Sequence, residues 1–135
     1  MSDAPSTRSA DTSRKRILLV DDEAEVAALV VHLLGSNGFD ARAISNPLDV
    51  VKQAAGFRPD LLILDFHLPK LLGPELALLL QRSPETRGIP IIFLSGMTDE
   101  DHRTIATISG GAAYLEKPVN EAKLLDTIRT ILFES

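Results

Sequence analysis

The sequence of 135 residues is long enough for one domain with a hydrophobic core, but it is too short for two domains of ordinary size. Apolar residues make up 44% of the chain and charged residues 24%, which is typical of a globular protein. The formal net charge of −5 argues against nucleic acid as a partner, because binding to phosphates depends on clustered Lys and Arg. The chain contains no Cys, which excludes disulfides and thiolate metal sites and fits a reducing cytoplasm.

Residues 1–15 are rich in Ser, Thr, Asp and Arg and contain no apolar segment. They therefore predict a disordered polar tail and not a secretory signal. We assign residues 16–135 to one folded domain. No apolar run is long enough to cross a membrane, so we expect a cytoplasmic protein that has no membrane partner.

From residue 17 onward, short apolar runs alternate with longer stretches of helical spacing. Continuous apolar runs predict buried strands at residues 17–20, 61–64 and 91–94, and weaker patterns predict strands at residues 40–44 and 112–115. Five such strand–helix units predict an α/β fold, in which helices cover both faces of a parallel sheet.

Apolar residues between the strands recur at three- and four-residue intervals, the spacing of one helical face. Five helices are expected: one that ends by Gly35 and Gly38, and four that begin at Asn46-Pro47, Gly73-Pro74, Thr98 and near Asn120. The residues expected to face the core from the first and third helices are Val26, Leu29, Val30, Leu33, Leu34, Leu76, Leu79 and Leu80.

Polar side chains follow four of the five predicted strands. These side chains belong to Asp21-Asp22-Glu23, Asp65, Ser95-Gly96 and Glu116-Lys117-Pro118. Because a site in an open parallel sheet lies beyond the carboxyl ends of the strands, we expect them to converge at one edge. Mg²⁺ prefers oxygen ligands, and two carboxylates plus a phosphate oxygen would supply part of its coordination shell.

The chemistry of these residues suits phosphoryl transfer. Asp65 stands alone at the end of its strand, where a carboxylate can act as a nucleophile and form an acyl phosphate. Lys117 would bring positive charge to a phosphoryl oxygen, and Ser95 would donate a hydrogen bond. The charges of Asp21, Asp22 and Asp65 would be balanced by Mg²⁺ and Lys117, so an incoming phosphoryl group would not be repelled.

In this order along the chain, these landmarks resemble the receiver domain of two-component response regulators, from Arg16 to about Phe133. The matching residues are Asp21-Asp22, the stretch 65–73 (DFHLPKLLG), Ser95-Gly96, Tyr114 and Lys117-Pro118. The resemblance implies a doubly wound, flavodoxin-like fold with strand order 2-1-3-4-5 and five helices. Since the resemblance and the polar tail together account for the whole sequence, we expect a stand-alone, single-domain regulator with no output domain after Ser135, unless the sequence is an excised domain.

The resemblance assigns roles to individual residues. It implies that Asp65 accepts the phosphoryl group, and that Asp21, Asp22 and Asp65 hold Mg²⁺ with the backbone carbonyl of His67. It implies that Lys117 contacts the phosphoryl group, with a cis peptide bond before Pro118. Such a protein catalyses its own phosphorylation and dephosphorylation and is not a metabolic enzyme in the usual sense.

Ser95 and Tyr114 are expected, by the same resemblance, to be switch residues that respond to phosphorylation. They would change the face formed by the fourth helix, the fifth strand and the last helix. The implied partners are a sensor histidine kinase or a histidine phosphotransfer protein, and a downstream protein target. The protein is expected to be a monomer or a weak, phosphorylation-dependent dimer.

Three other interpretations are open. The protein could pass the phosphoryl group onward as a phosphorelay intermediate. A phosphatase of the haloacid-dehalogenase type also uses Asp and Mg²⁺, but it needs Asp-x-Asp after the first strand, where this chain has Asp21-Asp22-Glu23. A phosphorylation-independent binding module would not need the complete set of acids, acceptor and lysine.

Overall fold

The computed structural model describes residues 14–68, 71–96 and 111–133. Five parallel strands form one sheet in the order β2-β1-β3-β4-β5. Their bounds are β1 Arg16–Val20, β2 Asp40–Ile44, β3 Leu61–Asp65, β4 Ile91–Ser95 and β5 Gly111–Glu116. The predicted α/β fold and its strand order are therefore confirmed.

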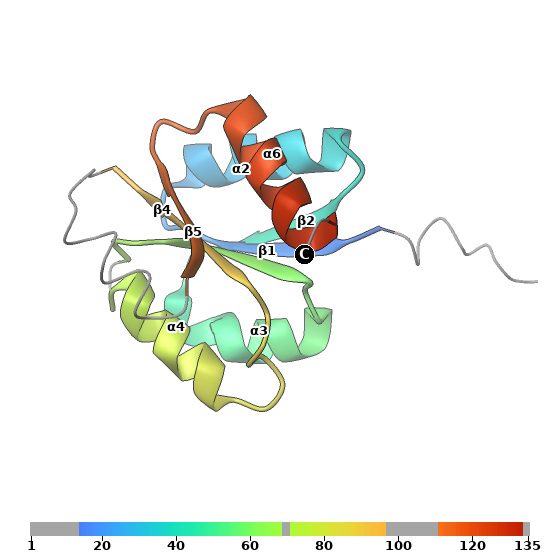
Figure 1. The fold of residues 1–135 in the computed structure, drawn as a ribbon. Helices are drawn as coiled ribbons and strands as arrows, with labels where there is room; N and C mark the ends of the chain where they lie inside the picture. Colours follow the sequence, from blue (N-terminus) through green and yellow to red (C-terminus); the bar gives the residue numbers. More distant parts are fainter. Residues whose placement is uncertain (1–13, 69–70, 97–110, 134–135) are drawn as a thin grey trace, which may run out of the picture.

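Helices cover both faces of this sheet (Figure 1). On one face lie α2 (Ala24–Ser36) and α6 (Glu121–Phe133). On the other lie α3 (Val50–Phe57), which follows the 3₁₀ turn η1 (Pro47–Asp49), and α4 (Gly73–Arg82). The helix expected from Thr98 and residues 1–13 of the predicted tail, which extends to residue 15, lie outside the described residues.

The core forms two layers because successive side chains of a strand point to opposite faces of the sheet. Every side chain of β3 and β4 is buried, and so are four of the five in β1. Leu18, Leu62 and Phe93 belong to the layer on the α3–α4 side. Ile17, Ile63 and Leu94 belong to the layer on the α2–α6 side. The sheet is thus a rigid platform whose strand ends can hold a site.

Two leucines expected in the core are exposed instead. Leu29 in α2 is 47% exposed and Leu79 in α4 is 45% exposed. The buried face of α2 consists of the buried residues Val30 and Leu34 and the partly buried residues Val26 and Leu33. The centre of this face lies about 90° around the helix axis from Leu29. Around the axis of α4, Leu79 lies about 110° from the centre of the three buried residues Leu76, Ala77 and Leu80.

The start of the domain is tied to the sheet. Arg14 donates from Nη1 to the carbonyl of Phe39 at 3.5 Å, and the carbonyl of Lys15 accepts the amide of Asp40 at 2.9 Å. The backbone contact of Lys15 continues the pairing of β1 with β2 by one residue. None of the helices in the described part of the chain combines the length and the apolar character that crossing a membrane requires.

Candidate functional site

Four sequence-predicted residues stand where strands end at one edge of the sheet. Asp21 directly follows β1, Asp65 is the last residue of β3, Ser95 is the last residue of β4, and Lys117 directly follows β5. The Lys117 amide donates to the Ser95 carbonyl at 2.7 Å, which holds the end of β5 beside β4. The parallel sheet therefore brings together residues that are up to 96 positions apart.

The two buried carboxylates of the site are oriented in the same way. Asp21 Oδ1 accepts the amide of Glu23 at 2.9 Å, and Asp65 Oδ1 accepts the amide of His67 at 3.1 Å. In each case the backbone N–H two residues later fixes one oxygen. The other oxygen, Oδ2, faces Lys117 in both residues.

The Lys117 ammonium lies among three carboxylates. Its Nζ is 2.7 Å from Glu23 Oε1, 3.0 Å from Asp21 Oδ2 and 3.2 Å from Asp65 Oδ2. Burial by itself would lower the pKa of Lys117, but the contacts with Glu23 and Asp21 and the charge of Asp65 raise it above its ordinary value. Lys117 is therefore a fixed positive charge at this edge.

The contact between Glu23 and Lys117 was not predicted from the sequence. It is the shortest of the three contacts, although the Glu23 side chain is 58% exposed. The position of Glu23 directly after the acidic pair was visible in the sequence. Its pairing with a lysine 94 residues away depends on the fold.

The acidic residues of the site fit a hard divalent cation. Asp21, Asp22 and Asp65 each offer a carboxylate oxygen, and these oxygens lie within 4.8 Å of one another. Asp21 Oδ2 is buried and has no donor with hydrogen-bond geometry in the part of the chain that the structure describes, although it forms an ion pair with Lys117 Nζ at 3.0 Å. Asp22 is exposed and leaves the cluster open to solvent. An all-oxygen donor set with one open side is suitable for Mg²⁺, which keeps several water ligands.

The pKa of Asp65 is raised from 3.8 to about 6. The largest cause is burial, and the negative charge of Asp21 adds to it. The His67 amide and the Lys117 ammonium act in the opposite direction. Asp65 is thus ionised at neutral pH, but its charge is costly in the absence of a cation.

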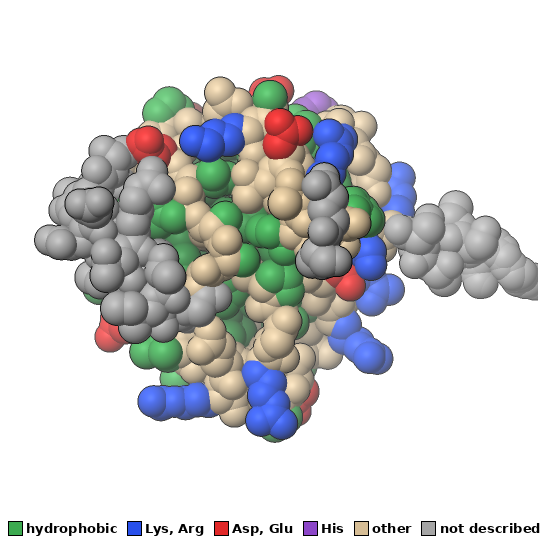
Figure 2. Space-filling model, viewed as in Figure 1, with side chains coloured by type: hydrophobic (Ala, Val, Ile, Leu, Met, Phe, Trp, Pro, Cys, Tyr) green, Lys and Arg blue, Asp and Glu red, His purple; other side chains and the backbone are tan. Residues whose placement is uncertain are grey.

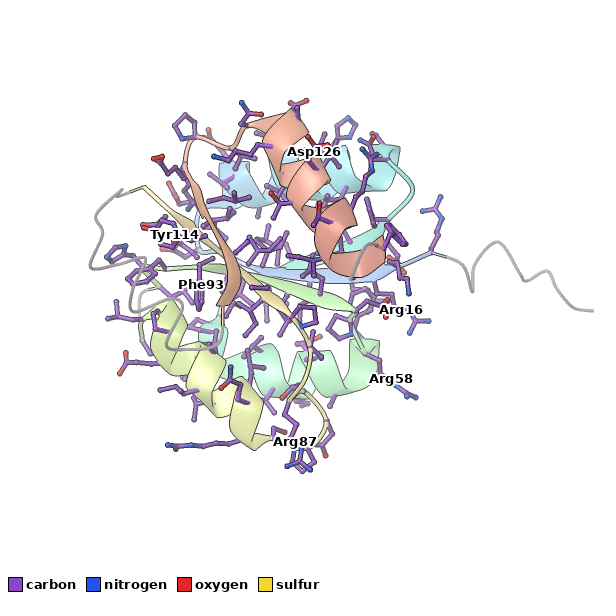
Figure 3. All side chains as sticks on the ribbon, in the orientation of Figure 1. Arg16, Arg58, Arg87, Phe93, Tyr114 and Asp126 are labelled. Atoms are coloured by element: carbon purple, nitrogen blue, oxygen red, sulfur yellow. The ribbon has the colours of Figure 1, made fainter. Side chains whose placement is uncertain are left out.

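Ser95 and Tyr114 lie at the β4 and β5 side of the site. Ser95 is fully buried, and Tyr114 is partly buried against the core layer on the α3–α4 side. The Tyr114 ring stands edge-on to Phe66 with 6.1 Å between ring centroids, and Phe66 stands edge-on to Phe93 at 6.0 Å. Figure 3 labels Tyr114 and Phe93. The aromatic contacts connect the residue after Asp65 to β5.

The remaining predicted site residues are at the rim. The His67 side chain is exposed, and its ring centroid is 5.2 Å from that of Phe66. The Lys117–Pro118 peptide bond is cis. Neither His67 nor Pro118 adds a side chain to the carboxylate cluster.

Gly73, at the start of α4, was part of the matched stretch but had no assigned role. Its amide donates to the Phe66 carbonyl at 2.8 Å. A Cβ atom at this position would lie 2.5 Å from the Asp65 carbonyl oxygen and 3.0 Å from Phe66 Cα. Only a glycine lets α4 approach the backbone of Asp65 this closely.

Basic side chains gather at the opposite end of the sheet, near the start of β1 (Figure 2). Arg16 and Arg58 are there, away from Tyr114 (Figure 3). The Arg42 guanidinium lies 4.3 Å from the centroid of the Phe57 ring, a cation–π contact at the same end. Since these cations are remote from the acidic cluster, Lys117 is the basic residue of the described part of the chain that supplies positive charge at the site.

Comparison with known proteins gives a consistent result. Residues 17–129 match the family model described as the response regulator receiver domain. The chain is 33% identical over 122 residues to the DNA-binding response regulator MtrA of Mycobacterium tuberculosis. It is 32% identical over 118 residues to the phosphate regulon transcriptional regulatory protein PhoB of Klebsiella pneumoniae. These matches cover 90% and 87% of this chain but 52% of each relative, so the chain spans about half their length.

Solved structures are similar over most of the chain. A response regulator from Chloroflexus aurantiacus superposes with a TM-score of 0.84 at 28% identity and covers 89% of this chain and 98% of its own. The chemotaxis protein CheY4 of Vibrio cholerae has the same TM-score at 24% identity, covers 89% of this chain and 100% of its own, and supports the fold alone.

Proposed function

Since this chain belongs to the family of response regulator receiver domains, a family of phosphorylation-dependent signalling, we propose that Asp65 is the residue that accepts the phosphoryl group. The observation that carries this proposal is the placement of Asp65. It lies at the end of a fully buried strand, with Oδ2 turned to Lys117 and with Asp21 and Asp22 beside it. A nucleophile, a cation site and a fixed positive charge thus meet at one edge.

We assign Asp21, Asp22 and Asp65 as the side chains that would hold Mg²⁺, with the His67 carbonyl as a further ligand. The bound ion would neutralise charge on the carboxylates and on the phosphoryl oxygens. The buried Asp21 Oδ2, which contacts the Lys117 ammonium at 3.0 Å without hydrogen-bond geometry, supports this assignment because it can still serve as a cation ligand. Receiver domains generally use such an acidic pocket.

The proposed reaction transfers a phosphoryl group from a phosphohistidine of a kinase or phosphotransfer protein. An oxygen of Asp65 forms the new P–O bond, while the P–N bond breaks and its electron pair stays on the imidazole. Lys117 balances charge on the transferred group, and the fixed Oδ1 of Asp65 limits rotation of the nucleophile. Catalysis would thus consist of positioning and charge balance, without a general base.

The proposed output begins at Ser95 and Tyr114. Ser95 is buried at the end of the strand beside β3, where its hydroxyl would turn toward the phosphoryl group and donate a hydrogen bond to it. Tyr114 contacts Phe66, the residue after Asp65, and would respond to the same change. The altered face would include β5 and α6, together with residues 97–110, which are outside the described part.

Phosphorylation by a small phosphodonor tests the proposal. Intact-mass spectrometry of the protein incubated with acetyl phosphate and Mg²⁺ should show one added phosphoryl group, and chelation of Mg²⁺ should abolish it. The adduct should be cleaved by hydroxylamine at neutral pH, which attacks the carbonyl of an acyl phosphate and leaves the phosphate esters of Ser and Tyr intact. A phosphorylated species that is stable to hydroxylamine would contradict Asp65 as the acceptor. Transfer onward from this adduct to a histidine protein would favour the relay alternative over a terminal switch.

The affinity for Mg²⁺ should depend on pH in a defined direction. Below about pH 6 a proton occupies Asp65 and has to leave before a cation binds. The rise in Tm caused by Mg²⁺ should therefore be large at pH 8 and should shrink below pH 6, with apparent affinity falling by about tenfold per pH unit. Thermal unfolding at several MgCl₂ concentrations measures this. An affinity that does not change between pH 8 and pH 5 would contradict it.

A control variant separates this effect from general surface charge. Asp126 is exposed on α6, where Figure 3 labels it, and it is not one of the three clustered carboxylates. Asp126→Asn should therefore retain the pH dependence of the wild-type protein.

A further inference from the structure

The outer face of α4 has an unusual composition. The helix buries Leu76, Ala77 and Leu80 against the sheet. Its opposite side exposes Leu78 at 44% and Leu79 at 45%. A helix that is apolar on both sides is normally covered on both sides, so the exposed leucines indicate a surface that another molecule covers.

Charged residues flank the two leucines symmetrically. Glu75, Leu78, Leu79 and Arg82 are all exposed and are spaced at i, i+3, i+4 and i+7, so they form one face of the helix. The midpoint between Glu75 and Arg82 is also the midpoint between Leu78 and Leu79. We call these four residues the outer α4 face.

This arrangement is self-complementary. In an antiparallel pair related by a two-fold axis between Leu78 and Leu79, Glu75 of each copy lies opposite Arg82 of the other. The leucines then pack against each other across the axis. A two-fold interface uses the same patch on both molecules, so the patch has to carry both members of each contact.

We propose that the outer α4 face is a docking surface for a second copy of this chain, packed as an antiparallel helix pair. The described part of the proposed phosphorylation-responsive face lies on β5 and α6 and shares no residue with the outer α4 face. A single pair of ten-residue helices is small compared with the roughly 1,200–2,000 Å² of a stable interface. The dimer is therefore weak and depends on concentration.

Sedimentation velocity of the unphosphorylated protein over a range of concentrations tests this. The wild-type protein should shift from monomer toward dimer as concentration rises, and Arg82→Glu should weaken association by about tenfold or more. Arg87→Glu is the matched control, because Arg87 is exposed outside this face and the charge change is the same. A wild-type protein that stays monomeric throughout, or equal weakening by both variants, would overturn the proposal.

A mixing experiment distinguishes the predicted pairing from a general effect of charge. Glu75→Lys should also fail to dimerise, because it would place two basic residues opposite each other. An equimolar mixture of Glu75→Lys and Arg82→Glu should dimerise, since both of its contacts are again between opposite charges. If the mixture remains monomeric while both variants are folded, the antiparallel pairing is wrong.

Folding of Glu75→Lys has to be measured separately. The Glu75 carboxylate also accepts the Leu72 amide at 2.8 Å at the start of α4, so this variant loses a helix cap. Rescue by mixing would show that the lost cap does not explain the loss of association.

Discussion

Asp65→Asn should abolish phosphoryl labelling while it stabilises the metal-free protein at neutral pH. The amide is close to the carboxylate in size and can still accept the His67 amide, but it cannot serve as the nucleophile. Intact-mass spectrometry after incubation with acetyl phosphate and Mg²⁺ should therefore show no adduct. Labelling of the variant at the wild-type rate would exclude Asp65 as the acceptor.

The stability effect follows from the pKa of Asp65. The folded-state value of about 6 is above the ordinary value of 3.8, so the contribution of this group to stability is greatest at low pH and is lost as pH rises through about 6. At pH 7.5 the buried carboxylate destabilises the fold, and Asn removes that cost. Since loss of the Lys117 contact offsets part of the gain, we expect a net increase on the order of 1 kcal/mol.

Urea unfolding without Mg²⁺ at pH 7.5 and at pH 4 measures this difference. The advantage of Asp65→Asn should be present at pH 7.5 and should largely disappear at pH 4, where the wild-type side chain is protonated. Asp126→Asn is the control, because Asp126 is exposed and should show little change at either pH. A variant that is less stable than the wild-type protein at pH 7.5 would show that the contact with Lys117 outweighs the cost of burial.

The three central strands of the sheet, β1, β3 and β4, were predictable because they are buried on both faces. Continuous apolar runs marked β3 and β4 nearly to the residue. The weaker pattern at residues 112–115 also corresponds to a strand, β5, which extends one residue further at each end. The order of the strands required the family resemblance.

Helix faces were less predictable from the sequence. In α4, apolar residues occupy most of the circumference, so the spacing of leucines does not determine which side meets the sheet. Leu79 satisfies the helical interval but lies on the solvent side. Only the position of the helix on the sheet distinguishes it from Leu80, which is buried.

The residues of the site were predictable where the backbone alone places them. Asp21, Asp65 and Lys117 converge because they follow parallel strands of one sheet. The contact between Glu23 and Lys117 could not be predicted, because it depends on side-chain conformation at the rim. The close approach of Gly73 to Asp65 depends on where α4 packs, which local sequence does not determine.

Gly73→Ala should cost substantial stability and should disturb the acceptor. The added Cβ would meet the Asp65 carbonyl oxygen at 2.5 Å and Phe66 Cα at 3.0 Å, and both are backbone atoms that cannot rotate away. Relief requires α4 or the end of β3 to move, for which we expect a loss of about 2–3 kcal/mol in the free energy of unfolding. Urea unfolding measures the loss, and the rate of labelling by acetyl phosphate should fall because Asp65 moves relative to Lys117.

Gly56→Ala provides the matched control for this substitution. Gly56 lies in α3, and a Cβ there would meet no heavy atom within 4 Å. The same chemical change should therefore stabilise the protein by about 0.5–1 kcal/mol through helix propensity and leave labelling unchanged. Opposite signs for the two variants would assign the cost at Gly73 to its contact with the Asp65 backbone. If Gly73→Ala were as stable as the wild-type protein, α4 would not need glycine to pack beneath the acceptor.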